Sequence, residues 1–385
     1  MRVADLFSGI GGFTVALDVF EDVETVTYCD IDGRSQAILK KHVDQGTLPK
    51  APIHNDVSTL HLAPGSVDMI VGGFPCTGFS WVGFREGIQN KGSSLVNQVF
   101  RLVQEASPKF VLMENVTAIT LFPEYRDICT AFSELGYRVT WTCVKACDVG
   151  APTKRYRWFA LCSRQDVDPG SLTLRLKGDN NKLPLHRWID TEPERTVPTI
   201  PWKSKDRLFL LGNTVVPSAV RVAFVMLFTG LSIDVDTLLD MREYTFQIPS
   251  ATAVISKDDV VASKTGVWDD GFCSVVPPAM TTRLYRSLNL VLDPGSWVTD
   301  KPRMHSSAHQ TPSPLISHRV NLPLWATPRC QMGCSNYLSR RTKTDLRTQI
   351  RFEQNTRDKA GYISPEFVEW LQGYPQGWTA FQVEE

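Results

Sequence analysis

The fold is decided by the stretch DLFSGIGG, residues 5–12, where a strand pattern gives way to a helical one. Residues 3–7 have the pattern of a buried strand, and residues 13–20 have helical periodicity. Glycines between a strand and a helix allow a tight turn and let a ligand approach the backbone closely. The stretch therefore predicts the first strand–turn–helix unit of a ligand-binding α/β fold.

The alternation of strand and helix patterns continues to about residue 165. Strands are expected at 25–29, 67–71 and 110–113, helices at 34–42, 95–106 and 125–135, and a closing strand pair at 137–144 and 157–162. Such alternation predicts a mostly parallel sheet with helices on both faces. Further helices are expected at 215–227 and, with an aromatic-rich turn, at 364–378.

Composition places the chain among ordinary globular proteins. It has 385 residues, 42% hydrophobic and 21% charged, which excludes fibrous and disordered classes. There is no run of about 18 apolar residues, so no membrane span is expected. The N-terminus also lacks the apolar core of a signal peptide. Nine scattered cysteines do not form a dense disulfide framework, which favours a reduced, intracellular environment.

Basic residues are distributed unevenly along the chain. Lysine plus arginine and aspartate plus glutamate both number 41, which argues against a protein that simply coats nucleic acid. Residues 299–351, however, hold nine basic and two acidic residues, whereas residues 1–165 hold 16 basic and 17 acidic. The sequence therefore predicts a local basic surface near the C-terminus, with an ordinary solvated surface as the alternative.

Two acidic residues at strand ends indicate a nucleoside ligand. Asp30 ends the second strand, 21 residues after Gly9, where a carboxylate can accept hydrogen bonds from both ribose hydroxyls. This pairing suits a nicotinamide cofactor and S-adenosylmethionine equally, and a glycine turn without a ligand is a third alternative. Asp56 follows the next strand in the sequence NDV, where its carboxylate is placed to bind an adenine amino group.

Cys76 and Glu114 are the candidates for covalent and acid–base chemistry. Cys76 follows GGFP, residues 72–75, at the end of a strand, where ligands bind in open α/β sheets. A thiolate there is a nucleophile, and a small buried hydrophobe is the alternative. Glu114 follows the apolar run 110–113, and apolar walls can raise the pKa of a carboxyl group so that it holds a proton. A capping or ion-paired glutamate is the alternative.

Arg155 and Arg157 are the third chemical feature. Two arginines spaced two residues apart in a strand share a face of the sheet. They are able to bind a phosphate or to orient a carboxylate. Solvated surface charge is the alternative for such a pair.

Seven segments at compatible spacings make the chain resemble the cytosine-5 DNA methyltransferase family. They are DLFSGIGG at 5–12, CDID at 29–32, NDV at 55–57, VGGFPCTGFS at 71–80, MENV at 113–116, GAPTKRYRWF at 150–159 and LGNTVVPSAV at 211–220. The resemblance implies a Rossmann-like, S-adenosylmethionine-dependent α/β methyltransferase domain with a smaller, irregular target-recognition domain. The first is expected in residues 1–229, with an irregular connection at 166–206 and a GN-containing element at 207–229. The second is expected in residues 230–385 and ends in a C-terminal helix.

The resemblance also implies roles for individual residues. Cys76 would attack carbon 6 of a cytosine, and Glu114 would hydrogen-bond ring nitrogen 3 and the exocyclic amine. Arg155 and Arg157 would brace the flipped cytosine and the cysteine loop. The S-adenosylmethionine site would be lined by Phe7, Gly9, Gly11, Asp30, Ile31, Asp56, Val57, Asn213 and Val215.

Double-stranded DNA is the expected substrate. Because the target carbon of a stacked base is out of reach, the cytosine is expected to flip out of the duplex. Residues 80–92 would then close over it as a mobile loop. Sequence recognition is expected in residues 230–355, chiefly 299–351, although loops carry no readable code for the target sequence. The expected DNA contacts are Ser80, Arg329, Arg340 and Arg341.

Three features depart from the usual family pattern. Thr153 stands where the family usually has a glutamine before its arginine pair, and Trp370 stands where an arginine is common. In addition, Gly212-Asn213 precedes the recognition region instead of following it. Similar arrangements occur in phage and large-virus relatives, so a viral or mobile-element origin is expected. The protein would then act in the cytoplasm, or in the nucleus of a eukaryotic host.

Alternative functions are distinguished by particular residues. A tRNA methyltransferase would carry a Cys-Phe-Thr signature, for which the sequence FCS at 272–274 is a poor substitute. An inactive DNA-binding relative would not be expected to keep both Cys76 and Glu114. The leading hypothesis is therefore a monomeric DNA methyltransferase, with a restriction endonuclease as a functional partner.

Two further patterns have weaker interpretations. Two histidines and two cysteines have a spacing that permits tetrahedral zinc, but solvent-facing histidine and reduced cysteine are favoured, and no metal is assigned. These residues are His305, His309, Cys330 and Cys334. The stretch WATPR at 325–329 looks like a phage-family signature for which the sequence provides no mechanical role.

Overall fold

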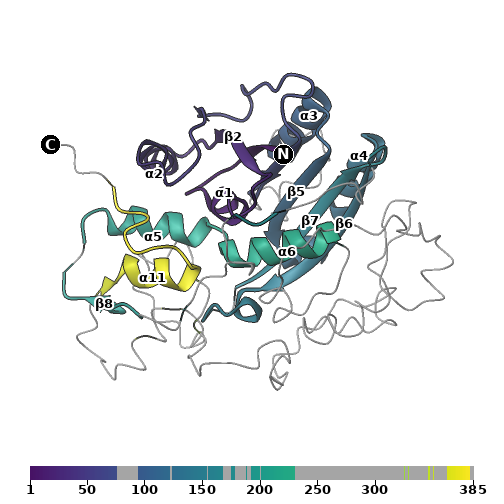
Figure 1. The fold of residues 1–385 in the computed structure, drawn as a ribbon. Coiled ribbons are helices and arrows are strands. Elements are labelled where there is room, and N and C mark those ends of the chain that lie inside the picture. The colour runs from purple at the N-terminus through teal and green to yellow at the C-terminus, as the bar shows by residue number, and fades with distance from the viewer. Residues whose placement is uncertain are drawn as a thin grey trace, which may run out of the picture.

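A central β-sheet with helices on both faces forms the body of the protein (Figure 1). The computed structural model describes residues 1–75, 94–121, 124–153, 155–167, 175–177, 192–199, 201–229 and 362–381, together with Trp188, Trp325, Pro328, Leu346 and Ile350. The expected α/β fold with a mostly parallel sheet is confirmed over these residues.

The sheet has seven strands in the order β3-β2-β1-β4-β5-β7-β6. Strands β1 to β5 pair in parallel, whereas β7 runs antiparallel to both β5 and β6. From β1 the chain first builds outward through β2 and β3, and then returns to add β4 and β5 on the other side. The order therefore reverses between β1 and β4, and ligands of open α/β sheets bind at such a reversal. The strands are β1 Arg2–Leu6, β2 Glu24–Cys29, β3 Ile53–His54, β4 Met69–Gly72, β5 Phe110–Val116, β6 Tyr137–Lys145 and β7 Tyr156–Arg164.

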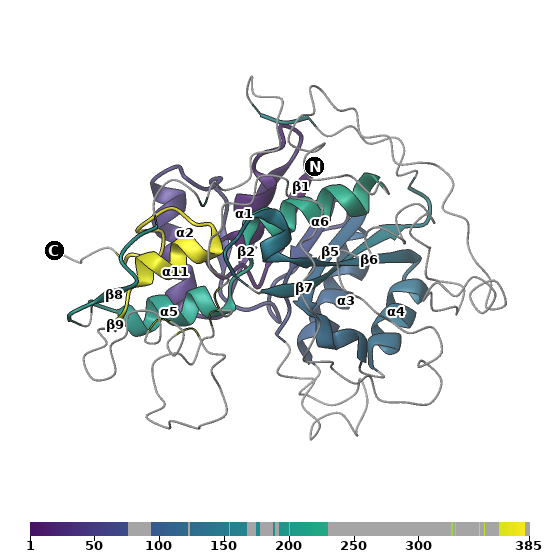
Figure 2. The ribbon, with the colours of Figure 1, turned by 90° about the horizontal axis from the view of Figure 1, so that it is seen from below.

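Helices cover both faces of the sheet. Helices α1 and α6 lie on one face, and α3 and α4 lie on the other (Figure 2). The helices are α1 Gly12–Leu17, α2 Gly33–Asp44, α3 Ser94–Ala106, α4 Glu124–Glu134, α5 Ser204–Asn213, α6 Pro217–Thr229 and α11 Pro365–Gln372. Two short 3₁₀ helices, η4 Thr117–Leu121 and η5 Ala146–Val149, connect elements at the sheet, and a separate two-stranded sheet pairs β8 Thr196–Val197 with β9 Tyr362–Ile363.

Alternate residues of each central strand enter two different hydrophobic cores. In β4, Met69 and Val71 pack with α1 and α6, whereas Ile70 packs with α3 and α4. In β5, Leu112 and Met113 divide between the two cores in the same way. Side chains of a strand alternate between its faces, so an apolar run without polar interruption indicates a strand that is covered on both sides.

Two element boundaries differ from the sequence predictions. Strand β5 continues to Val116, so Glu114 and Asn115 lie inside the strand instead of after it, because β7 pairs with β5 along its full length. Helix α5 begins at Ser204, in the stretch predicted to be an irregular connection. The following helix starts at Pro217, where the fixed φ of proline suits a first helical position.

Helix α11 near the C-terminus packs against α5 (Figure 1). It starts at Ser364, whose Oγ accepts a hydrogen bond from the Phe367 amide, and it ends at Gly373 in a left-handed conformation. Phe367 and Leu371 are fully buried in the same core as α1 and α6. The sequence grouped this helix with residues 230–385, and the structure places it on the catalytic unit. The boundary between residues 229 and 230 stays a prediction.

One segment, Ser204–Phe228, is long and apolar enough to cross a membrane, with a mean hydropathy of 1.7. Among the described residues it comprises α5 and most of α6, which are separated by residues 214–216, with Thr214 in an extended conformation. In its most apolar window of 18 residues, 78% is buried inside the protein. Packing against the sheet therefore accounts for its apolar composition.

We predict that Phe367→Ala lowers the free energy of unfolding by about 3–5 kcal/mol, because it leaves a cavity in a core shared with the sheet. Chemical denaturation followed by circular dichroism measures this change. The control is Tyr362→Ala on the same segment, where the side chain is 44% exposed and a change within about 0.5 kcal/mol is expected. Equal, small effects of the two substitutions would show that α11 is not part of the cooperative core.

Candidate active site

The glycine turn after β1 adopts a backbone that few residues tolerate. Phe7, Gly9 and Gly11 have φ angles of 52°, 56° and 83°, all in the left-handed region. A non-glycine residue in this region is uncommon, and such residues gather at ligand sites. A Cβ atom built on Gly9 would meet nothing within 4 Å, so the space above the turn is open. The predicted cofactor turn therefore has room for a ligand.

A buried carboxyl group lies beneath this turn. Asp5 is fully buried and accepts a 2.8 Å hydrogen bond from the Thr14 hydroxyl. Burial raises the pKa of Asp5 to about 8, so the group is largely protonated at neutral pH. Its backbone carbonyl accepts a hydrogen bond from Ser8 Oγ at 2.5 Å, which fixes the start of the turn.

Asp30, at the end of β2, faces the turn. Its Oδ2 accepts a hydrogen bond from the Gly9 amide at 2.7 Å, and its Oδ1 accepts one from the Asp32 amide at 2.9 Å. Burial raises the pKa of Asp30 above its ordinary value, while these two backbone hydrogen bonds lower it. A carboxylate can accept about four hydrogen bonds. Asp30 therefore retains acceptor capacity for ligand hydroxyls.

Three further predicted cofactor-site residues, Ile31, Asp56 and Val57, lie next to these strand ends. Ile31 follows Asp30 and is 78% exposed, which presents an apolar surface at the edge of the sheet. Asp56 follows β3, and its Oδ1 accepts a hydrogen bond from the Ser58 amide at 2.8 Å, which lowers the pKa of Asp56. Val57 is buried beside it. A ribose and an adenine ring fit this combination of two carboxylates and one apolar surface.

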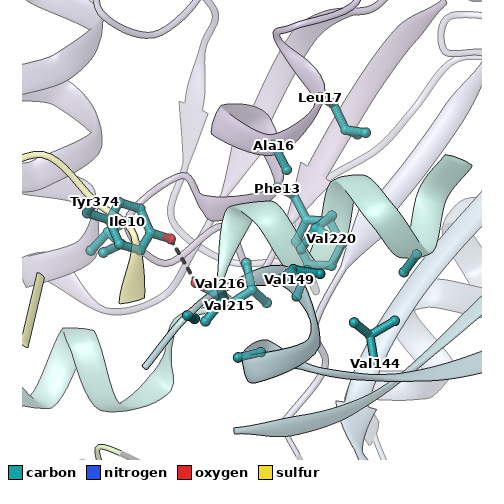
Figure 3. Close-up of a cluster of buried hydrophobic side chains, with 14 of the residues drawn as sticks. Ile10, Phe13, Ala16, Leu17, Val144, Val149, Val215, Val216, Val220 and Tyr374 are labelled. Carbon is teal, nitrogen blue, oxygen red and sulfur yellow. Dashed lines mark hydrogen bonds between the residues drawn. The ribbon is translucent and has the colours of Figure 1, made fainter. Parts of the chain in front are cut away.

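The GN-containing element lies against the first turn of α1. Asn213 is exposed at the end of α5, whereas Val215 is buried between α5 and α6. A Cβ atom on Gly12 would lie 2.6 Å from Val215 Cγ2 and 2.5 Å from the Tyr374 hydroxyl. Figure 3 shows Val215 and Tyr374 beside Ile10 of the turn. Glycine at position 12 is therefore required for this close approach.

Glu114 forms an ion pair with one of the two predicted arginines. Its Oε1 lies 2.9 Å from Arg157 Nε, and both side chains are largely buried. A Cβ atom on Gly73 would lie 2.8 Å from Glu114 Oε2. The carboxylate thus lies over the glycine that leads toward Cys76, and Arg157 compensates its charge.

Asn115 is a functional candidate that the sequence analysis did not single out. Its side-chain amide donates a 3.1 Å hydrogen bond to the Phe74 carbonyl, and its Oδ1 accepts one from the Val116 amide at 2.8 Å. It therefore anchors the start of the segment that carries Cys76. Its place in the motif MENV, next to Glu114, is the signal that identifies it in the sequence.

Arg155 is buried and binds a different part of the protein from Arg157. Its guanidinium donates to the carbonyl oxygens of Gly212, at 3.3 Å, and Thr214. Burial lowers the pKa of Arg155 to about 9. Arg155 therefore braces the GN-containing element, and its predicted contact with the flipped cytosine stays a prediction.

Trp325, the first residue of the WATPR stretch, contacts the residues before β7 and also α11. Trp325 is buried, and its amide donates a 2.9 Å hydrogen bond to the Pro152 carbonyl. It forms a parallel β-bridge with Thr153, the residue that replaces the usual glutamine. Its ring packs edge-on against Phe367, with ring centroids 5.4 Å apart. Trp325 thus contacts both α11 and the stretch Pro152–Thr153, which precedes the two arginines.

Several predicted site residues lie outside the described part of the chain. They are Cys76, Ser80, Arg329, Arg340, Arg341 and the four zinc candidates His305, His309, Cys330 and Cys334. Within the described residues, no group of three or more histidine, cysteine or acidic side chains could hold a metal ion.

Comparison with known proteins identifies the family of this chain. The model of the family described as C-5 cytosine-specific DNA methylase matches residues 1–209. The chain belongs to this family. The resemblance noted in the sequence is thereby confirmed, and the chain is a DNA cytosine-5 methyltransferase.

The family includes relatives of different lengths and sources. Type II methyltransferase M.CviJI of Paramecium bursaria Chlorella virus IL3A is 27% identical over 401 residues, which cover 100% of this chain and 99% of that protein. Type II methyltransferase M.Sau3AI of Staphylococcus aureus is 31% identical over 183 residues, 44% of each chain. The crystal structure of S. pombe Dnmt2 methyltransferase aligns over 43% of this chain and 52% of that one, with 23% identity and a TM-score of 0.36.

We predict that Gly73→Ala slows methyl transfer by about 100-fold or more, because the new methyl group would displace the Glu114 carboxylate, and small misplacements of catalytic groups have effects of this size. Single-turnover methylation kinetics measure the rate. Gly33→Ala is the matched control, since a Cβ atom there meets nothing within 4 Å. Equal rates for the two variants would show that Glu114 tolerates the displacement.

Proposed function

We propose that this methyltransferase acts on a specific sequence in double-stranded DNA, with S-adenosylmethionine as the methyl donor and Cys76 as a covalent nucleophile. The observation that carries the proposal is the Arg157–Glu114 ion pair above Gly73, at the start of the segment that leads to Cys76. Asp30 meets the glycine turn at the carboxyl ends of β1 and β2. Because β1, β2, β4 and β5 are parallel, these ends lie at the same edge of the sheet as the carboxyl ends of β4 and β5, which Gly73 and Glu114 adjoin.

The cofactor-facing residues divide the work of binding. Asp30 would accept the ribose hydroxyls, Ile31 would contact the adenine ring, and Asp56 would accept its amino group. Phe7, Gly9 and Gly11 would allow close approach of the backbone, and Asn213 and Val215 would border the opposite side. When bound, S-adenosylmethionine supplies an electrophilic methyl group.

Cytosine carbon 5 needs activation before it can accept a methyl group. The Cys76 thiolate would add to carbon 6, and the electron pair of the ring double bond would then be available at carbon 5. Glu114, paired with Arg157, would in its protonated form donate a hydrogen bond to ring nitrogen 3 and accept one from the exocyclic amine as the ring gains negative charge. After carbon 5 has gained the methyl group, transfer of its proton to solvent water would restore the double bond and expel the Cys76 thiolate.

Recognition of the DNA sequence is assigned to residues 230–355, with the basic stretch 299–351 as its main contact. Nine basic residues against two acidic ones in that stretch favour contacts to phosphates and base edges. We further propose that the protein acts as an intracellular monomer alongside a restriction endonuclease. Sedimentation analysis and tests of a neighbouring endonuclease on methylated and unmethylated DNA would examine these two points.

Substrate class is tested by incubating the full-length protein with labelled S-adenosylmethionine and either duplex DNA or tRNA. Incorporation into DNA, followed by bisulfite sequencing, should reveal one recurring sequence that contains 5-methylcytosine. Labelling of tRNA alone would contradict the proposal.

We predict that Cys76→Ala abolishes methyl transfer but leaves S-adenosylmethionine binding intact, because the thiol acts on the base and not on the cofactor. The unmodified chain should form a covalent complex with DNA that contains 5-fluorocytosine, since fluorine cannot leave as a proton does. Denaturing electrophoresis detects this complex. Its absence from the unmodified chain, under conditions where unsubstituted DNA is methylated, would disprove the covalent route.

We predict that Glu114→Gln lowers the turnover rate by roughly 100-fold or more, the usual contribution of a positioned acid–base group. The amide fills the same space but loses the ion pair with Arg157. Rates at saturating cofactor and DNA measure the effect. Glu105→Gln, which removes the ion pair of the partly buried Glu105 with Arg101 on α3, is the control and should keep the normal rate; turnover of Glu114→Gln at that same rate would assign Glu114 a structural role.

A further inference from the structure

Residues 373–380, which we call the C-terminal clasp, lie beside the cofactor turn although they are far from it in sequence. The Trp378 indole Nε1 donates a 3.0 Å hydrogen bond to the carbonyl of Ile10, inside the glycine turn. The same ring stacks on His42 of α2, with ring centroids 3.7 Å apart. The clasp therefore contacts both elements that follow the cofactor-facing strand ends.

Tyr374 joins the clasp to the GN-containing element. Its hydroxyl donates to the Val215 carbonyl at 3.1 Å and lies 2.6 Å from the Thr214 hydroxyl, as the dashed contact to Val215 in Figure 3 illustrates. A tyrosine hydroxyl has one proton. When that proton binds Val215, the Thr214 hydroxyl must be the donor to Tyr374, so a single arrangement satisfies both bonds.

The same hydroxyl also lies against the first residue of α1. A Cβ atom on Gly12 would lie only 2.5 Å from it. On the other side of Thr214, the carbonyl oxygen accepts a hydrogen bond from Arg155. Thr214 is thus held between Tyr374 and Arg155, which lies two residues before the Arg157 that pairs with Glu114.

The clasp has a scaffold that does not depend on Tyr374. Glu369 is fully buried and accepts hydrogen bonds from Arg207 Nη2 at 2.9 Å and from the amides of Gly377 at 2.7 Å and Thr379 at 2.8 Å. Lys41 donates to three backbone carbonyls at the end of the clasp. Removal of the Tyr374 hydroxyl should therefore leave the turn folded.

We infer that Tyr374 is a positioning residue for S-adenosylmethionine binding. Its hydroxyl holds Thr214 and Val215 against Gly12, and this fixes the distance between the two sides of the cofactor site. The inference rests on the proposed cofactor site and adds to it a residue from the other end of the chain. A phenylalanine would keep the ring packing and lose only the positioning contact.

The test is calorimetric titration of the full-length protein with S-adenosylmethionine in the absence of DNA. Tyr374→Phe should bind about tenfold more weakly, the factor expected when one hydrogen bond is lost and its partner is left unsatisfied. The KM for the cofactor should rise by a similar factor, and kcat at saturation should change less than about threefold. A purely structural role would instead lower the melting temperature and reduce the fraction of active protein, without raising the KM for the cofactor relative to kcat.

Tyr137→Phe is the matched control, because Tyr137 is also a buried tyrosine whose hydroxyl donates to one carbonyl, that of Pro108, away from the cofactor site. It should bind the cofactor normally. Thr214→Val removes the partner hydroxyl and should weaken binding like Tyr374→Phe, with no further loss in the double variant. If Tyr374→Phe does not fold, Thr214→Val alone tests the same contact.

Cofactor affinity of Tyr374→Phe and Thr214→Val equal to that of Tyr137→Phe would overturn the inference, provided that Asp30→Ala weakens binding. This result would leave the proposed function intact. Failure of the unmodified chain to bind S-adenosylmethionine would instead contradict the proposed cofactor itself.

Discussion

The hydrogen bonds from Arg155 to the GN-containing element connect the two halves of the active site. The guanidinium is buried and binds the carbonyl oxygens of Gly212 and Thr214. Arg155 directly precedes β7, and Arg157, two residues further along the chain, pairs with Glu114 on the side where cytosine chemistry is proposed. On the opposite side, Val215 packs against Gly12 at the start of α1. A buried charge is costly unless its partners are held in place, so this arrangement constrains both sides at once.

Two glycines lie where segments of the proposed site approach one another too closely for any larger side chain. Gly73 makes room for the Glu114 carboxylate, and Gly12 makes room for Val215 and the Tyr374 hydroxyl. At both positions the space is filled by another functional segment and not by solvent. The requirement for glycine at these two places thus comes from contacts between elements. Gly9 differs, because its left-handed φ angle shapes the turn and the space above it stays open for a ligand.

Helix α6 and the segment just before the C-terminal clasp lie in the same hydrophobic core, although they are far apart in the sequence. The GN-containing element ends at residue 229, and the chain returns to the same core at β9 and α11 after more than a hundred residues. Trp325, Leu346 and Ile350 from the intervening stretch are also buried in this core. The predicted recognition region, residues 230–355, therefore contributes at least these three residues to the same core, and β9 and α11 follow it. The full-length match to a viral methyltransferase fits the expectation of a viral arrangement.

The sequence by itself determined the α/β fold, the cofactor turn with Asp30, and the candidates Cys76 and Glu114, because these features depend on local patterns of apolar residues, glycines and strand ends. Its prediction that Arg155 and Arg157 share one face of a strand is wrong, because β7 begins at Tyr156 and the two side chains bind different parts of the protein. Only the tertiary structure decided that Arg157 binds Glu114 while Arg155 binds the GN-containing element, that Asn115 anchors Phe74, and that Tyr374 binds Val215. These contacts join residues from 41 to 159 positions apart, and no local pattern specifies which distant carbonyl or carboxylate a buried donor will meet.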